Sequence, residues 1–165
     1  MRVRSISHAA TTWLVVILAW GAVVAALVSQ QAFGFEPCPW CVVQRVAYLL
    51  VGLFALLATF VQQSRRRARS LLALSALGAA GGLAAALHQQ LVAAQSSSCA
   101  YTAADRWIAM LRLDTLLPPL FKATAACDKA NEPMLGVPYA LWSVAVALVL
   151  LALLMRATAR TAERR

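Results

Sequence analysis

The sequence predicts an all-α fold: an integral membrane bundle of four helices with a short interfacial helix in the second of two exported loops. Of the 165 residues, 62% are hydrophobic and 13% are charged, whereas about a quarter of a typical soluble domain is charged. Each apolar run has about the 20 residues that a helix needs to cross a bilayer. The four runs form one expected domain, residues 1–165, and lie at about 11–28, 42–61, 71–92 and 135–155.

The distribution of charge predicts the orientation of these spans. The two termini and the turn between the second and third runs hold 10 of the 15 basic residues and one acid, Glu163. The remaining charges cancel, so the net charge of +9 lies entirely on that side. Because basic segments stay in the cytoplasm, we expect both termini there and exported loops at about 29–41 and 93–134. Membrane topology thus explains the net positive charge. The sequence does not show the basic groove with interleaved aromatic residues that would indicate nucleic-acid binding.

A cleaved signal peptide is the alternative for the first run. The chain does begin with basic residues, but its first apolar stretch is longer than the 7–15 residues usual in such a peptide. A membrane span is therefore the favoured interpretation.

The second loop contains the expected interfacial helix. Trp107, Ile108 and Leu111 fall on one face of a helical pattern, and Pro118-Pro119 prevents a regular helix from continuing. We expect one or two helical turns that lie along the bilayer surface with this apolar face towards the lipid. A loop packed on the bundle is the alternative.

All four cysteines lie in the two exported loops: Cys38 and Cys41 in the first, Cys99 and Cys127 in the second. Disulfides persist in oxidising compartments such as the periplasm, so this placement favours disulfide chemistry. We expect no metal site, because Cys99 and Cys127 are too far apart in sequence to form the second half of a zinc site. Covalent haem attachment would need a histidine at the position of Val42.

The motif Cys38-Pro39-Trp40-Cys41 stands at the start of the second apolar run. Proline is favoured at the first helical position, so we expect Cys38 to cap this helix and Cys41 to lie in its first turn. The partial positive charge of a helix N-terminus stabilises a thiolate there. Arg45, one turn later, is the only charged residue in the four runs. It is expected to stabilise the Cys41 thiolate or to bind a carbonyl of a small molecule, and snorkelling to the membrane surface is the alternative.

Together these features resemble the bacterial DsbB family of disulfide bond formation proteins over almost the whole chain. The resemblance rests on four spans with inside termini, Cys-x-x-Cys entering the second helix and arginine four residues later. It also includes two cysteines in a long second loop and the entry to the last span, Gly136-Val137-Pro138-Tyr139-Ala140-Leu141-Trp142. It implies a quinone-dependent thiol oxidase of the bacterial inner membrane with periplasmic cysteine loops. The implied partners are a DsbA-like thioredoxin-fold protein and the lipid bilayer, and the implied cofactor is ubiquinone or menaquinone.

The resemblance also implies a role for each matching cysteine. Cys99 would accept attack from the reduced DsbA-like protein and form a mixed disulfide with it. Cys127 would relay the electrons to the first-loop pair by attack on Cys38. Cys41, freed by that exchange, would pass the electrons to the quinone beside Arg45, which would contact the quinone head group and stabilise the charged intermediate.

His88 lies near the exported end of the third run. Titratable groups within membrane spans favour a functional role, and the resemblance implies that His88 lies near the quinone. A hydrogen bond within the bundle is the alternative for a single histidine.

Two other classes of protein remain as alternatives. A quinone reductase of the vitamin K epoxide reductase type also has a four-helix bundle with Cys-x-x-Cys beside a quinone, but its redox pair follows the loop cysteines in the chain, the reverse of the order here. A structural membrane protein would use its disulfides only to staple the loops. The close spacing of Cys38 and Cys41 argues against this, because it makes a small, exchangeable ring.

Overall fold

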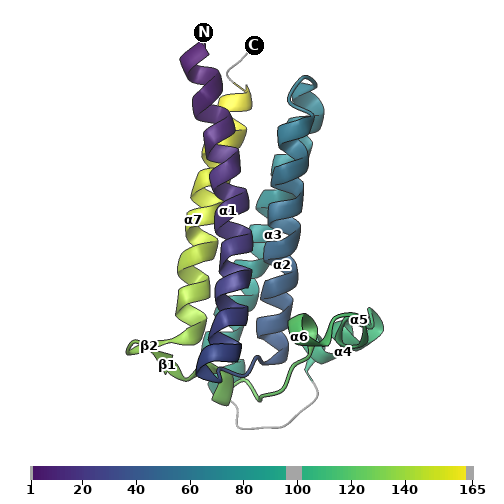
Figure 1. Ribbon diagram of the computed structural model, residues 1–165, viewed down its shortest axis with the longest axis vertical. Coiled ribbons are helices and arrows are strands. Elements are labelled where there is room, and N and C mark those ends of the chain that lie inside the picture. Colours follow the sequence, from purple (N-terminus) through teal and green to yellow (C-terminus); the bar gives the residue numbers. More distant parts are fainter. Residues whose placement is uncertain (1, 96–101, 163–165) are drawn as a thin grey trace.

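Four long helices run alongside one another as a bundle in the computed structural model, which describes residues 2–95 and 102–162 (Figure 1). Each has a stretch long and apolar enough to span a membrane. The prediction of an all-α membrane bundle is therefore confirmed. The four helices are α1 (Arg2–Phe33), α2 (Pro39–Phe60), α3 (Arg65–Leu91) and α7 (Tyr139–Ala162).

The outer faces of the bundle are apolar, as expected of a chain surrounded by lipid. Ile17 is 63% exposed and Leu77 is 69% exposed, whereas Leu150 in the bundle core is fully buried. A water-soluble protein rarely exposes contiguous apolar surface of this kind. The chain is thus a multi-pass membrane protein. Other large apolar side chains on the outer faces are Trp13, Val24, Leu53, Leu57, Leu148 and Val149.

Helix α3 lies close against α2 because two glycines leave room for the neighbouring side chains. A Cβ atom on Gly78 would stand 3.1 Å from Cγ2 of Val51, and one on Gly82 would stand 3.2 Å from Cε1 of Tyr48. Such short contacts leave no space for a larger residue. This close approach brings the end of α3 alongside the beginning of α2, where two of the cysteines lie.

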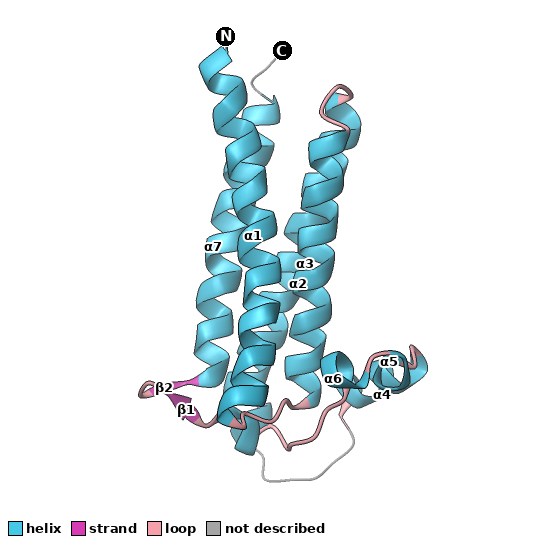
Figure 2. Ribbon diagram, in the orientation of Figure 1, coloured by secondary structure: helices cyan, strands magenta, loops and turns pink. Residues whose placement is uncertain are grey.

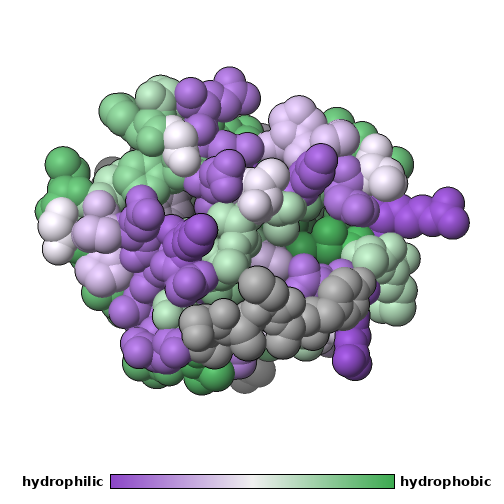
Figure 3. All heavy atoms as spheres, turned by 90° about the horizontal axis from the view of Figure 1, so that it is seen from below, coloured by the Kyte–Doolittle hydropathy of each residue, from purple (hydrophilic) through white to green (hydrophobic). Residues whose placement is uncertain are grey.

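The beginning of α1, the end of α7 and the turn between α2 and α3 lie at one end of the bundle (Figure 1). The other end, which we call the loop end, carries residues 34–38 and the second loop (Figure 2). Seen from outside, the loop end shows many hydrophilic side chains among apolar ones (Figure 3). The basic segments and the described cysteines therefore lie at opposite ends of the molecule.

The described part of the second loop, residues 93–95 and 102–134, contains five short helical pieces beside the loop end. A capping box between Thr102 and Asp105 starts the first full helix, α4, and Asp105 Oδ2 accepts from the Thr102 backbone N–H at 2.8 Å. The pieces are η1 (Ala93–Gln95), α4 (Ala103–Met110), α5 (Leu113–Leu116), α6 (Pro118–Phe121) and η2 (Lys129–Asn131).

Only Ile108 departs from the expectation that these three residues share one apolar face. Ile108 is 6% exposed and packs with Val42 and Phe121, whereas Trp107 is 51% and Leu111 is 56% exposed. The backbone N–H of Leu111 donates to the carbonyl oxygen of Trp107 at 3.1 Å, so these two residues keep the helical spacing, and Ile108 alone turns towards the bundle. One side of the loop therefore packs on the bundle and the other turns apolar side chains outward.

A two-stranded hairpin precedes α7, which begins at Tyr139 and not at about residue 135 as expected. Strands β1 (Pro133–Met134) and β2 (Val137–Pro138) pair antiparallel. The two turn residues have positive φ angles, 55° at Leu135 and 81° at Gly136, as a tight hairpin requires. Apolar composition misled the prediction here, because Leu135 is 87% exposed.

Candidate redox site

The beginning of α2 has the geometry that its sequence predicts. Cys38 is the N-cap, with φ −86° and ψ 169°, and Pro39 takes the first helical position. The Sγ atom of Cys38 accepts a hydrogen bond from the backbone N–H of Cys41 at 3.4 Å. The predicted cap is therefore confirmed, and Cys41 lies in the first turn, where the unpaired N–H groups of the helix favour negative charge.

Three cysteines gather at this helix start. The Sγ atoms of Cys38 and Cys41 are 3.1 Å apart, and Cys127 packs in the same buried cluster. All three residues are free thiols and all are buried, Cys38 completely. Cys99 lies outside the described residues. The structure thus brings together both first-loop cysteines and one cysteine of the second loop.

Hydrogen bonds between the loops fix Cys127 beside Cys38. The carbonyl oxygen of Pro37 accepts from the backbone N–H groups of residues 124–125, at 2.9 and 3.3 Å. On the other side of Cys127, Asn131 Nδ2 donates to Gln90 Oε1 at 2.9 Å. The segment that carries Cys127 is therefore attached both to the first loop and to α3.

The two thiols that meet between the loops differ in acidity. The hydrogen bond with Cys38 lowers the pKa of Cys127. The pKa of Cys38 is raised by its hydrogen bonds with Cys127 and Cys41 and by burial. Cys127 is therefore the readier of the two thiols to ionise, and the thiolate is the nucleophilic form of a cysteine.

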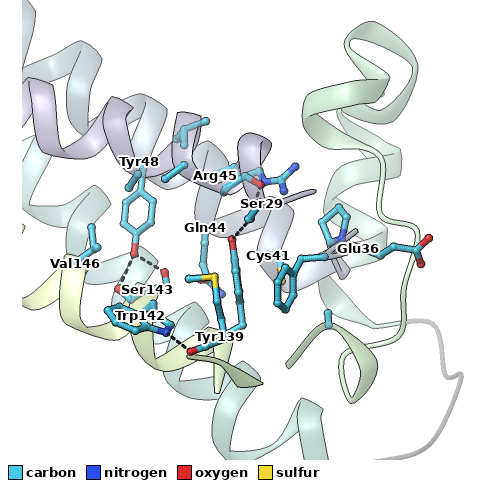
Figure 4. A pocket seen from close by; sticks show the side chains of 18 residues that line it. Ser29, Glu36, Cys41, Gln44, Arg45, Tyr48, Tyr139, Trp142, Ser143 and Val146 are labelled. Atoms are coloured by element: carbon cyan, nitrogen blue, oxygen red, sulfur yellow. Dashed lines mark hydrogen bonds between the residues drawn. The ribbon is translucent and has the colours of Figure 1, made fainter. Parts of the chain in front are cut away.

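A cavity of about 230 Å³ opens beside Cys41, between α1, α2 and α7 (Figure 4). Small residues of α1, Ala22, Ala25 and Ala26, make room on one side. The polar wall includes the hydroxyl groups of Ser29 and Tyr139, which are hydrogen-bonded at 2.9 Å. The cavity is therefore mainly apolar, with a few polar groups near the reactive sulfur. Its other lining residues include Phe35, Glu36, Gln44, Arg45, Tyr48, Trp142, Ser143 and Val146.

Arg45 is a buried cation in this wall. Only 4% of its surface is exposed, so the alternative that it snorkels to the membrane surface is wrong. Its Nη1 donates to the carbonyl oxygen of Leu120 at 3.0 Å, and its buried Nε has no hydrogen-bond partner. A buried donor without a partner is costly. Arg45 therefore contributes a buried positive charge to the wall of the cavity.

His88 lies away from this cavity. Its ring packs against Trp40, with ring centroids 4.4 Å apart, and the side chain is exposed. Its neighbour Gln89 is fully buried and contacts Cys41 instead. Sequence analysis missed Gln89 and its partner Gln44 because neither side chain titrates; the only signal was amide groups in otherwise apolar helices.

Comparisons with known proteins identify the family of this chain. The family profile described as "Disulfide bond formation protein DsbB" matches residues 8–157. Over 152 residues, the chain is 35% identical to disulfide bond formation protein B of Ralstonia nicotianae, covering 92% of this chain and 94% of that protein. It is 34% identical to the protein of the same name from Cupriavidus necator over 131 residues, 79% and 80% of the two chains. It is 36% identical to disulfide bond formation protein B 1 of Pseudomonas savastanoi over 133 residues, 80% and 78% of the two chains.

No solved structure matches the chain. The family match nevertheless includes all four apolar helices and every cysteine, and the related proteins align along most of their length. The chain therefore belongs to the DsbB family of disulfide bond formation proteins, which makes it a membrane oxidoreductase that forms disulfides.

Proposed function

We propose that this protein is a quinone-dependent thiol oxidase that reoxidises a DsbA-like thioredoxin-fold protein of the periplasm. The observation that carries the proposal is the position of Cys41. It is the last of three adjacent sulfurs, and it also lines an apolar cavity whose wall includes the buried cation Arg45. The sulfur chain suits exchange with a protein dithiol, and the cavity suits a lipid-soluble electron acceptor.

The residues of the cavity fit a quinone. Its apolar wall suits the ring and tail, and Arg45 would bind a carbonyl oxygen beside Cys41. Ubiquinone and menaquinone both have such carbonyls. The quinone would supply an acceptor for two electrons and two protons. Because His88 does not line the cavity, we propose that it acts on the site only through its contact with Trp40.

The proposed thiol chemistry passes one electron pair inward. A thiolate of the partner attacks Cys99 of a second-loop disulfide and frees Cys127, which attacks Cys38 of the first-loop disulfide and frees Cys41. The partner's second thiol then closes its own disulfide and frees Cys99, which displaces Cys38 from Cys127. The first-loop thiols give up two electrons and two protons to the quinone as their disulfide forms again.

Oxidation of a DsbA-like protein requires an electron acceptor other than ordinary protein disulfides. DsbA has a reduction potential of about −120 mV, whereas structural disulfides have potentials below about −300 mV. Exchange with ordinary disulfides would therefore reduce DsbA and not oxidise it.

Filling the cavity tests this proposal. Replacing Ala26 with phenylalanine should raise the KM for quinone about 10-fold, because overpacking a filled space costs on the order of 1–3 kcal/mol. Ala26 lines the cavity. The measurement is the rate of quinol formation at increasing quinone concentration, with a reduced DsbA-like protein as electron donor.

Val24→Phe is the matched control, because Val24 lies on the same helix and is 58% exposed on its outer face. This variant should keep the KM of the wild type. Equal kinetics for Ala26→Phe and Val24→Phe would mean that the acceptor binds elsewhere.

The proposed location is the bacterial inner membrane, with both termini in the cytoplasm. In a variant without native cysteines, a cysteine at Thr124 should react with a membrane-impermeant maleimide applied to the periplasm. A cysteine at Ser64, in the basic turn between α2 and α3, should react only after the cells are opened. Labelling of the Ser64 position from the periplasm would reverse the proposed orientation.

A further inference from the structure

A fully buried amide faces the sulfur of Cys41 from α3. Gln89 Nε2 lies 3.3 Å from Cys41 Sγ, and Gln89 Oε1 lies 3.5 Å from the same sulfur. Oε1 also accepts a hydrogen bond from Gln44 Nε2 at 2.7 Å. Gln89 has no exposed surface and Gln44 is 5% exposed, so both amides are largely shielded from water.

We propose that Gln89 is a positioning residue that holds the Cys41 sulfur in both its thiol and its thiolate form, and that Gln44 orients Gln89 for this task. The inference deepens the proposed function, because it concerns the step at which Cys41 delivers electrons to the cavity.

An amide can serve both forms of a thiol because it carries a donor and an acceptor. The Cys41 thiol donates its S–H to Oε1, and the thiolate accepts an N–H from Nε2. Neither change requires the Gln89 side chain to move, because both atoms already lie within reach of the sulfur. A hydrogen bond to the charged form is the stronger of the two, and no water competes with it in a buried site.

Gln44 supplies the orientation. If the Gln89 amide turned over, its oxygen would face the thiolate where the nitrogen now lies. The hydrogen bond from Gln44 Nε2 to Gln89 Oε1 opposes that rotation. Gln44 lies three residues after Cys41 on α2 and also lines the cavity, whereas Gln89 does not. The pair therefore connects the buried side of Cys41 to the cavity wall.

A polar bridge that only joined α2 to α3 would be the simpler role for these glutamines. The two roles differ in their dependence on pH. A structural bridge affects Cys41 equally at every pH, whereas a thiolate donor matters only where the thiolate would otherwise be scarce.

The first test measures alkylation of Cys41 by N-ethylmaleimide from pH 6 to 10, in protein whose other three cysteines are serine. Gln89→Leu should react about 10-fold more slowly near neutral pH, as expected for loss of a hydrogen bond to a charged group. Its rate should rejoin that of the parent protein at high pH. Gln31→Leu is the matched control, because it removes an exposed amide near the end of α1 that takes no part in the site; its pH profile should be unchanged.

A profile for Gln89→Leu that is unchanged, or slower by the same factor at every pH, would overturn the proposal. This readout needs no quinone, so it decides the role of Gln89 even if the acceptor is a different molecule.

The second test uses the full set of cysteines and measures quinol formation. Gln89→Leu should lower kcat about 10-fold near neutral pH and leave the KM for quinone unchanged, because Gln89 does not line the cavity. Gln89→Glu should be slower still, because a carboxylate offers the thiolate no donor and repels it. A wild type that reduces no quinone would defeat the proposed function alone, whereas an active wild type with an equally active Gln89→Leu would defeat the present inference alone.

Discussion

Cys41→Ser protein should transfer no electrons to quinone, even with the other three cysteines intact. A serine hydroxyl cannot form a disulfide with Cys38, and Cys38 is fully buried and does not line the cavity. The sulfur chain would therefore end one residue short of the acceptor. The measurement is quinol formation after mixing with a reduced DsbA-like protein, and the expected result is the rate of a sample without enzyme.

The same variant should still form a disulfide between the loops. Cys38 and Cys127 already lie in one buried cluster, so mild oxidation of Cys41→Ser should join them, and mass spectrometry of the unreduced protein would identify the link. Quinone reduction at a substantial fraction of the wild-type rate would show that the electrons leave through another residue.

Arg45→Met should lower kcat/KM for quinone about 100-fold, because hydrogen bonds to charged groups contribute about 1.5–3 kcal/mol. Arg45 is the only charged group described in the buried wall of the cavity, and its Nε has no partner among the described residues. Methionine has a similar apolar stem, so the loss of kcat/KM would come from removal of the guanidinium and not from a change in side-chain volume. The measurement is the dependence of quinol formation on quinone concentration.

Arg45→Lys separates charge from shape. Lysine retains the positive charge but lacks the planar fork of the guanidinium, so it cannot both hold the carbonyl of Leu120 and offer a second fixed donor. We expect activity between that of Arg45→Met and that of the wild type. Thiol exchange between Cys127 and Cys38 should continue in both variants. Unchanged kcat/KM in Arg45→Met would remove Arg45 from the acceptor site.

Local sequence signals predicted the parts of the molecule that local physics determines. Apolar runs located the four membrane helices, because a helix that crosses lipid must be apolar over its whole length. Pro39 located the cap of α2 at Cys38, because proline fits the first helical position. The isolated charge of Arg45 indicated a special environment, and the structure gives that residue a buried place in a cavity wall.

The other features of the fold and the site depend on contacts between segments that are far apart in the sequence. The meeting of Cys127 with Cys38 was implied only by the family resemblance, and no local pattern indicates that Gln89 and not His88 faces Cys41. One residue of helical rotation separates those two side chains, and only the packing of α3 on α2 decides between them. The hairpin before α7 was missed because Leu135 is apolar but exposed.

The chain order of the cavity wall has a consequence for biosynthesis. The reactive sulfur lies on α2, but Tyr139, Trp142, Ser143 and Val146 of α7 complete the cavity. Ribosomes make α7 last, so a nascent polypeptide already displays Cys38 and Cys41 while the acceptor pocket does not yet exist. Under the proposed function, oxidative turnover would therefore begin only after α7 has been inserted, and a chain terminated before α7 would be inactive.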